Sequence, residues 1–156
     1  MEAYETNYTN ICKPSAIGLS LIPGNWNMHR AKNLCKILRG EINVISSDTN
    51  NDEILNMMIG SSTCAEHVWT GWWDLLKEGE WIPVSSSIPL QSQFEPPWMP
   101  GEPNGQTKEN CAVMKTIEYD NETKGIWNDV SCSYKYCAAC QIPSKPTFYL
   151  RGKRLI

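Results

Sequence analysis

The sequence lacks a long hydrophobic run, and charge of neither sign dominates it. No stretch approaches the roughly eighteen consecutive apolar residues of a membrane-spanning helix, so we expect no insertion into a membrane. Residues 1–10 are polar and do not contain the apolar segment of a signal peptide. The net charge is −3 and the sequence pI is near 5.4, which gives no electrostatic reason to expect a nucleic acid as partner.

Histidine and phenylalanine are scarce, with two residues of each. Neither His29 nor His67 has a serine or cysteine nucleophile at the spacing of a catalytic motif. We therefore interpret both histidines as structural or surface residues.

Tryptophan and cysteine, by contrast, are abundant, with seven of each. A length of 156 residues with 41 % apolar residues fits one domain with a substantial core. The cysteine count is high for a cytosolic protein, and the triplets Asn7-Tyr8-Thr9 and Asn121-Glu122-Thr123 are glycosylation sequons. We therefore expect a secreted protein, or the extracellular part of a cell-surface protein, with glycans at Asn7 and Asn121.

Hydrophobic periodicity predicts helices and strands in alternation. Helical spacing begins near Asn27 and ends at Gly40, and the cluster at 46–48 opens a second helix that runs through 52–58. The segments expected to form strands are Glu41 to Ile45, Val68 to Trp72, Cys111 to Met114 and Trp127 to Cys140, the last two flanking a polar turn at Asp120 to Gly125.

The segment from Lys77 to Thr107 has no periodicity, and a loop of this length inside a compact domain is typically functional. It contains Glu102-Pro103-Asn104, and Glu109 follows just before Cys111; Asn128 and Asp129 precede Cys132. Carboxylate and amide oxygens are the ligands that calcium prefers. A Cys111–Cys132 disulfide would bring these two groups to one edge of the domain.

The order of these motifs resembles that of the C-type lectin-like domain family. The resemblance covers about Cys12 to Ile142 and is carried by an opening helix–strand pattern, a core strand motif and a closing pattern: Trp26, Ala31, Cys35 and Gly40-Glu41-Ile42; Trp69-Thr70-Gly71-Trp72; and Trp127-Asn128-Asp129-Val130-Ser131-Cys132, with Cys140 following. It implies an α+β fold with two helices, two small antiparallel sheets and a long calcium- and sugar-binding loop region. We therefore expect a flexible segment at 1–11, one domain at 12–142, and a tail or linker at 143–156.

The resemblance also implies the roles of particular residues. The ligands of a principal Ca²⁺, which would also contact the sugar, would be Glu102, Asn104, Glu109, Asn128 and Asp129. In this family the Glu-Pro-Asn triplet goes with mannose, N-acetylglucosamine, glucose and fucose. The expected partners are therefore glycans or glycoproteins with terminal mannose-type sugars. An auxiliary calcium is not expected, because Gly105 and Asn110 stand where carboxylates would be needed.

Donor and acceptor chemistry gives a reason for that preference. A sugar hydroxyl offers one donor and two acceptor lone pairs, so it can ligate calcium, accept from an asparagine amide and donate to a carboxylate. Glu102 with Asn104, and Glu109 with Asn128, form two such pairs. We expect a cis bond between Glu102 and Pro103, because it would turn both flanking side chains toward one ion.

Family pairing implies the disulfides Cys35–Cys140 and Cys111–Cys132. Cys64 and Cys137 lie just before or within core strands, so we expect them to pair with each other. Cys137 and Cys140 could instead form a redox or zinc CxxC motif, but no second CxxC or histidine pair supports zinc. Cys12 is then the odd cysteine, and three alternatives stay open: it is unpaired, it bonds another chain, or it bonds a cysteine beyond the end of this fragment.

We expect no enzymatic activity. Glu102, Glu109 and Asp129 could act as the acid–base carboxylates of a glycosidase, but a carboxylate bound to calcium is a poor proton carrier. The other reading is a protein–protein adhesion or scaffold module of the same fold, in which calcium only orders the loop.

Overall fold

The computed structural model describes residues 17–85, 94–143, 149–150 and 153–154. Several predictions therefore lie outside the described residues and stay predictions. They are the glycosylation site at Asn7, the partner of Cys12, and most of the predicted terminal segments. None of the helices in the described ranges is long and apolar enough to cross a membrane.

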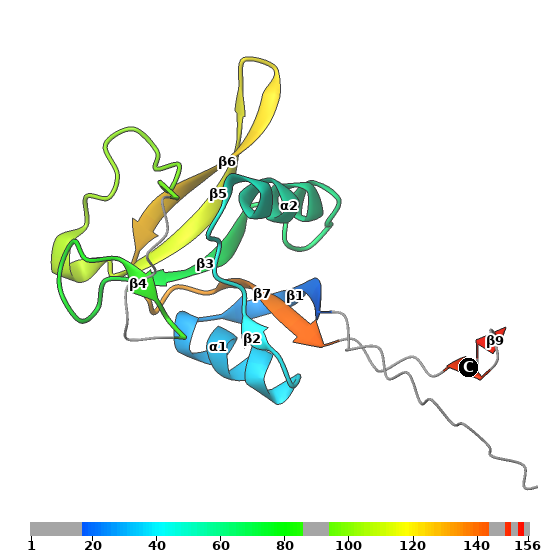
Figure 1. Ribbon diagram of the computed structural model, residues 1–156. Helices are drawn as coiled ribbons and strands as arrows, with labels where there is room; N and C mark the ends of the chain where they lie inside the picture. Colours follow the sequence, from blue (N-terminus) through cyan, green and yellow to red (C-terminus); the bar gives the residue numbers. More distant parts are fainter. Residues whose placement is uncertain (1–16, 86–93, 144–148, 151–152, 155–156) are drawn as a thin grey trace, which may run out of the picture.

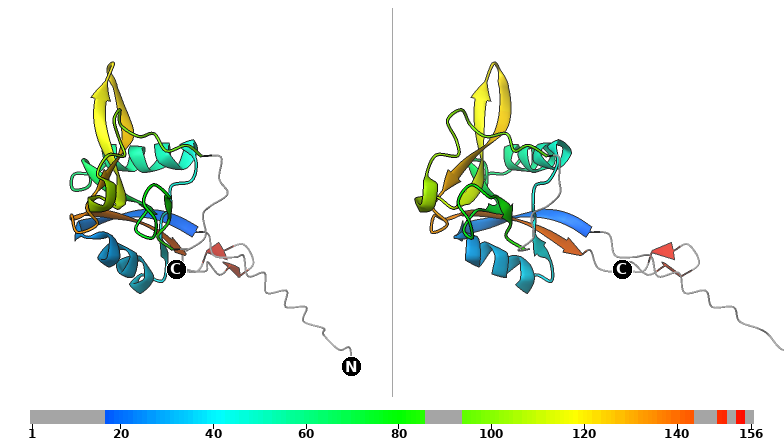
Figure 2. Two further views of the ribbon diagram at one scale, coloured as in Figure 1. Left: turned by 90° about the vertical axis from the view of Figure 1, so that its left-hand side faces the viewer. Right: turned by 60° about the vertical axis from the view of Figure 1, so that its left-hand side comes forward.

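Two helices pack on opposite sides of one mixed sheet (Figures 1 and 2). The helices are α1 (Met28–Ile37) and α2 (Asp48–Ile59). The path through the sheet is β1 (Ile17–Trp26), β7 (Tyr136–Pro143), β3 (His67–Trp73), β5 (Cys111–Tyr119) and β6 (Glu122–Val130), with β2 (Glu41–Ile42) on β7 and β4 (Ile82–Pro83) on β3. The remaining elements are a 3₁₀ turn, η1 (Gln106–Lys108), and a separate pair of short strands, β8 (Tyr149–Leu150) and β9 (Lys153–Arg154).

The sheet consists of two antiparallel parts joined at one place. Strands β1, β2 and β7 form one part, and β3 to β6 form the other. The parts meet where Val68 of β3 pairs in parallel with Cys137 of β7. This architecture is the expected α+β fold with two helices and two small antiparallel sheets.

Local capping explains where the helices begin. The Asn27 side chain accepts a hydrogen bond from the Arg30 amide, and the Ser47 side chain accepts one from the Asn50 amide. Both interactions satisfy amides that have no partner inside the first helical turn. The first helix ends at Ile37, earlier than predicted. Gly40 follows it at a point where a Cβ atom would collide with the Gln141 carbonyl, so the chain needs glycine there to reach β7.

Two buried clusters form the core, one beneath each helix. Trp127 is fully buried in the cluster under α2, and Trp69 is fully buried in the cluster under α1. All three expected disulfides form: Cys35–Cys140, Cys64–Cys137 and Cys111–Cys132. Cys137 and Cys140 therefore bond different partners and do not form a redox or zinc CxxC site.

The structure corrects several predicted strands. The strand Ile17–Trp26 was not predicted, and the strand expected at 41–45 is only two residues long. The hairpin of β5 and β6 extends to a turn at Asp120 and Asn121, so the predicted turn at 120–125 was too long. The segment 127–140 is two strands rather than one. Residues 115–126 are mostly polar and partly exposed, which is why apolar periodicity stops before the hairpin ends.

Candidate functional site

The triplet Glu102-Pro103-Asn104 lies on a loop that is fixed to the core strand β6. The amide of Trp127 donates to the Pro97 carbonyl at 2.8 Å, and the Met99 amide donates to the Trp127 carbonyl at 2.9 Å. The Glu102 amide then donates to the Met99 carbonyl at 2.9 Å, which closes a turn just before the triplet. The loop is therefore attached to β6 immediately before the residues Asn128 and Asp129.

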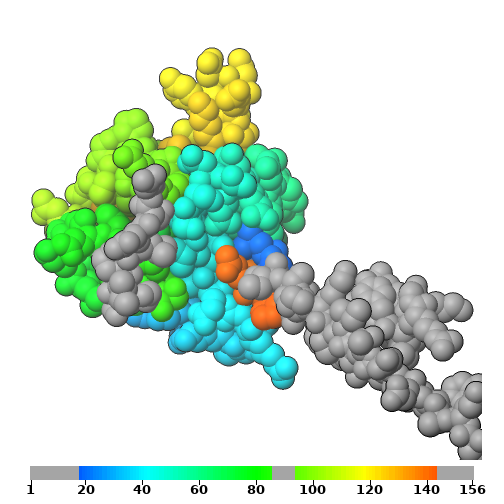
Figure 3. All heavy atoms as spheres, viewed as in Figure 1, coloured from blue at the N-terminus to red at the C-terminus, as the bar shows by residue number. Residues whose placement is uncertain are grey.

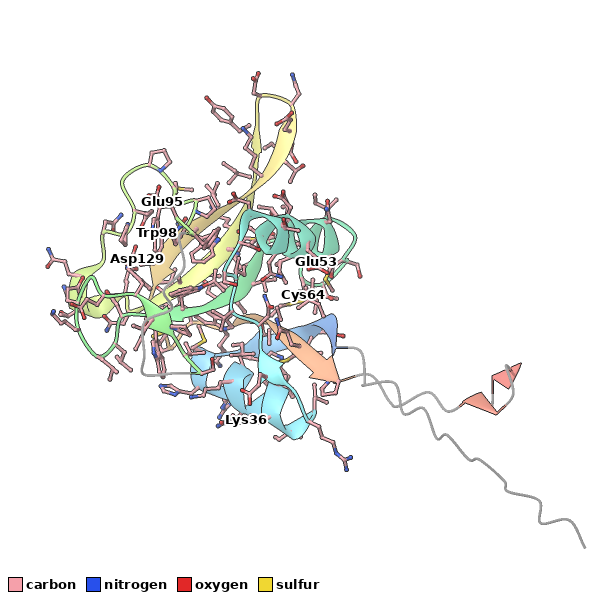
Figure 4. All side chains as sticks on the ribbon, viewed as in Figure 1. Lys36, Glu53, Cys64, Glu95, Trp98 and Asp129 are labelled. Atoms are coloured by element: carbon pink, nitrogen blue, oxygen red, sulfur yellow. A yellow bond between two sulfur atoms is a disulfide. The ribbon has the colours of Figure 1, made fainter. Side chains whose placement is uncertain are left out.

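Aromatic rings packed under the loop also hold it against β6. The ring of Trp98 meets that of Trp127 edge-on at 5.7 Å and also contacts Trp81, with centroids 5.0 Å apart. Figure 4 shows Trp98 near Asp129 on the same side of the molecule. Trp98 is thus a packing residue under the loop, as is the fully buried Trp127.

Within the triplet the two polar side chains face each other. The Glu102–Pro103 bond is cis, as predicted. The Asn104 side-chain amide donates to Glu102 Oε1 at 2.8 Å, which places an amide donor and a carboxylate acceptor side by side on an exposed loop.

Asp129 joins the loop to β6 directly. Its carboxylate accepts from the Asn104 amide at 3.0 Å on each oxygen, and its Oδ2 also accepts from the Gly105 amide at 2.7 Å. Each carboxylate oxygen has two lone pairs, so these bonds leave capacity for a cation. The structure therefore brings Asn104 and Asp129 together, although 25 positions separate them in the sequence.

The side chain of Glu109 also lies at this end of the loop, because Gly105 leaves room for it. After the turn η1, its side chain packs against the bare α-carbon of Gly105, where a Cβ atom would collide with the carboxylate and its stem. Gly105 is held by Asp129, so Glu109 lies beside the Asp129 end of the loop. The absence of a side chain at Gly105 thus makes room for a second carboxylate.

The carboxylates affect one another. A hydrogen bond with Asp129, burial, and the charges of Asp129 and Glu109 raise the pKa of Glu102 to about 7, against the lowering effect of the Asn104 amide. Burial alone would raise the pKa of Asp129, but hydrogen bonds from Glu102 and from the Gly105 and Asn104 amides lower it overall. Without a cation, the pair Glu102 and Asp129 therefore shares a proton near neutral pH.

A family model described as "Lectin C-type domain" matches residues 25–142. The chain belongs to the C-type lectin domain family. Over 118 residues it is 31 % identical to C-type lectin domain family 4 member M of Hylobates lar, a match that covers 76 % of the chain but 27 % of the relative. It is 28 % identical over 149 residues to CD209 antigen-like protein C of Mus musculus, covering 90 % of the chain and 76 % of that protein. The chain thus spans about a quarter of the length of the first of these relatives.

Solved structures show the same fold. The cow C-type carbohydrate-recognition domain of CD23, solved in the presence of a GlcNAc2Man3 oligosaccharide, has a TM-score of 0.63 and 26 % identity, with 81 % of this chain and 88 % of that chain covered. A calcium-independent type II antifreeze protein has a TM-score of 0.63 at 18 % identity, over 81 % of this chain and 86 % of its own. The second likeness concerns the fold alone.

Family membership supports carbohydrate binding, without enzymatic activity, as the general function of this C-type lectin domain. Lectin domains of this family are generally calcium-dependent, although structures such as the antifreeze protein show that the fold also exists without calcium.

The site residues of the lectin domain fit a cation because they combine carboxylate and amide oxygens. Across the described part of the chain, no three histidine, cysteine or acidic side chains form a metal-binding group on their own. A site here must therefore use amide oxygens too. Asn128 Oδ1 is buried and has no hydrogen-bond partner among the described residues, which is costly unless something binds it. A calcium ion would satisfy this oxygen together with those of Glu102, Asn104, Glu109 and Asp129.

Two acidic residues near this site were not predicted from the sequence. Asp74 directly follows β3, is 2 % exposed, and has one carboxylate oxygen bonded to the Gly79 amide at 2.9 Å and the other buried without a partner. Burial is the main effect that raises its pKa, and the charge of Asp129 adds to it. Glu78 experiences the charges of both Asp74 and Asp129. The sequence feature that could have indicated Asp74 is its position directly after the apolar run of a core strand.

Proposed function

We propose that this lectin domain binds mannose-type sugars through one principal calcium ion. Glu102, Asn104, Glu109, Asn128 and Asp129 would hold the ion, which supplies a charge that two neighbouring sugar hydroxyls can ligate. The single observation that carries the proposal is the buried, unpartnered Oδ1 of Asn128 on the strand that also holds Asp129 against Asn104.

The sugar preference follows from the order of acid and amide. Asn104 donates to Glu102 at 2.8 Å, so the pair offers a donor and an acceptor to one hydroxyl. A hydroxyl that ligates calcium can donate its proton to Glu102 and accept from Asn104, and the next hydroxyl can use Glu109 and Asn128 in the same way. Mannose, N-acetylglucosamine, glucose and fucose present hydroxyl pairs suited to this order. The GlcNAc2Man3 oligosaccharide present with the CD23 domain contains two of these sugars and supports the proposal.

The site is shallow, so one sugar should bind weakly. A dissociation constant of about 1 mM, or roughly −4 kcal/mol, is the expected strength for a monosaccharide. Useful affinity then requires several linked domains or branched glycans. Because Ile17 pairs with Pro143, the domain's two ends lie together, and Figure 4 places Asp129 on the other side of the molecule. This arrangement suits display of the site away from an extracellular anchor.

The test is retention of the purified domain on immobilised mannose in calcium, then in chelator, beside the double change Glu102→Gln and Asn104→Asp. We expect chelator to abolish retention and the double change to shift preference toward galactose, because it reverses the donor and acceptor positions. Glu95→Gln is the matched control, since Glu95 is an exposed carboxylate on the same loop.

Absence of retention would refute the sugar proposal. If calcium still raised the melting temperature in that case, the domain would be an adhesion or scaffold module in which the ion only orders the loop.

A further inference from the structure

The solvent side of helix α1 is positively charged along its whole length. The helix contains Arg30, Lys32 and Lys36 and no acidic residue, and Arg39 follows its end. These four permanent positive charges belong to a chain whose net charge is −3, so the rest of the sequence is acidic. The surface of α1 therefore attracts a polyanion that the carboxylates elsewhere on the molecule repel.

The charges of α1 lie in a row. His29, Lys32 and Lys36 recur at the spacing i, i+3 and i+7, which places them in one line along the helix. At a rise of 1.5 Å per residue, this line is about 10 Å long. Arg30 lies on the other flank of the exposed side, and Arg39 continues the positive charge beyond the end of the helix.

Packing on Trp73 holds the beginning of the row in place. The Lys32 ammonium lies 5.6 Å from the centre of the Trp73 ring. The ring of His29 contacts the same tryptophan, with centroids 5.6 Å apart and an interplanar angle of 60°. Side chains that are already ordered lose less conformational entropy when a ligand binds. This part of the row is therefore prepared for an anion.

None of the four cations is paired with a carboxylate in the part of the chain that the structure describes. The ion pair found there joins a lysine and a glutamate of the loop between β3 and β4. Glu41 borders the same small hollow as Arg39 without forming an ion pair with it. Outside the described residues the sequence contains two acidic residues, Glu2 and Glu5. These three carboxylates are fewer than the four cations, so α1 retains positive charge for a partner.

We propose that the exposed side of α1 is a second binding surface and that its partner is a linear sulfated polysaccharide. Sulfate groups recur along such a chain, and the row on α1 presents cations in the same linear order. Lysine and arginine donate charge-assisted hydrogen bonds to the oxygens of such anions. Figure 4 shows Lys36 at the lower end of the molecule, away from Asp129, so this surface is separate from the calcium residues. The proposal therefore does not rest on the proposed function.

Other polyanions fit this surface less well. The negatively charged leaflet of a cell membrane faces the cytoplasm, whereas three disulfides indicate an oxidising environment outside it. An acidic protein would need an apolar centre in its interface. The middle of the exposed side of α1 is the polar Asn33, and the exposed Ile37 lies at the end of the helix. A linear polysaccharide requires no such centre.

The test is binding of the purified chain to a heparin hexasaccharide, measured by calorimetry in chelator at several salt concentrations. We expect binding without calcium, with an affinity that falls linearly with salt on logarithmic axes because counter-ions are released. The double change Lys32→Gln and Lys36→Gln should weaken binding at least about tenfold and reduce the salt slope by about two, one for each lost contact. Lys32→Arg with Lys36→Arg should retain binding, since the charges remain.

The matched control is the double change Lys124→Gln and Lys135→Gln. It removes the same charge from two exposed lysines, one on β6 and one in the turn before β7. The affinity for heparin should change by less than about twofold, because salt screens charges that do not contact the ligand. Melting temperatures of both double variants establish that each is folded, and retention on mannose should be unchanged when Lys32 and Lys36 are replaced.

No binding to heparin at low salt, equal losses in the two double variants, or binding that requires calcium would each overturn the proposal. Polyglutamate of matched charge is compared at the same salt concentration. If polyglutamate bound as tightly as heparin, the surface would fit an acidic protein instead, and the polysaccharide would be rejected. All of these outcomes leave the mannose measurements unaffected, so a failure here is distinguishable from a failure of the proposed function.

Discussion

Trp127 and Asn51 are joined by a hydrogen bond of 2.9 Å between the indole N–H and the asparagine Oδ1. The same asparagine donates from its amide to the Gly125 carbonyl at 3.2 Å. Asn51 on α2 thus fixes β6 from the side opposite to the loop. Because Trp127 also carries the two backbone bonds to Pro97 and Met99, one buried asparagine stabilises the frame on which the site residues stand.

Replacing Asn51 by alanine leaves the buried Trp127 N–H and the Gly125 carbonyl without their partner. The expected loss is about 1–3 kcal/mol of unfolding free energy, together with weaker calcium binding. Urea unfolding with and without calcium measures both effects. Asn56→Ala, an exposed asparagine on the same helix, is the control and should change stability by less than about 0.5 kcal/mol. Equal effects of the two changes would contradict the role of Asn51.

Calcium affinity should depend on pH through Glu102. Its pKa is raised to about 7, so at lower pH an incoming ion must displace the proton that Glu102 shares with Asp129. We expect the affinity to be constant above pH 7 and to fall by up to about tenfold per pH unit below it. Calorimetry in buffers of different ionisation enthalpy should show about one proton released per ion at pH 6. An affinity that stays constant between pH 6 and 8 would rule out the shared proton.

Glu102 should also make the stability of the calcium-free domain depend on pH. The stability should fall as the pH rises, whereas the calcium affinity rises. A carboxyl whose pKa is higher in the folded state than in the unfolded chain stabilises the fold while both states are protonated. As the pH rises from the unfolded value of 4.5 toward 7, the unfolded chain ionises first, and this contribution is lost. Melting temperatures measured in chelator across that range test the sign, and the contribution should disappear in Glu102→Gln.

Gly105 should be required for calcium binding but not for folding. A Cβ atom at this position would collide with the Glu109 side chain and push its carboxylate away from Asp129. We expect Gly105→Ala to weaken calcium binding at least about tenfold, the loss of roughly 1.4 kcal/mol, with little change in stability without calcium. Gly60→Ala is the control, because its Cβ atom would meet only ordinary contacts at 3.6 Å or more. Unchanged calcium affinity in Gly105→Ala would remove Glu109 from the ligand set.

Asn121 is predicted to carry an N-linked glycan when the protein is made in a secretory host. It is exposed at the tip of the β5–β6 hairpin, which projects from the rest of the domain in Figure 3. Enzymatic deglycosylation should lower the mass, and Asn121→Gln should remove that difference. Sugar binding should be unaffected, because the tip lies at the other end of the strands from Asn128 and Asp129. An unglycosylated Asn121 in such a host would refute the prediction.

Several features could be read from the sequence because they depend on local chemistry. The caps at Asn27 and Ser47 define the helix starts, since a polar side chain there satisfies free amides of the first turn. The core strand around Trp69 follows from its apolar run. The disulfides Cys35–Cys140 and Cys111–Cys132 agree with the family pattern, and Cys64–Cys137 agrees with the position of these two cysteines beside core strands. The bond before Pro103 is cis, as its flanking polar side chains led us to expect.

Only the tertiary structure decided the rest, because the deciding contacts join residues far apart in the sequence. The strand Ile17–Trp26 contains proline and glycine, which weaken its strand signal, and pairing with β7 holds it in place. Three further contacts likewise depend on how distant strands pack together. Asp74 lies near Asp129, and Glu109 packs on Gly105. The ring of Tyr136 makes edge-on contacts with the rings of Trp69 and Tyr134. The sequence by itself determined which oxygens are available for a calcium ion; the packing of the strands decided which of them meet.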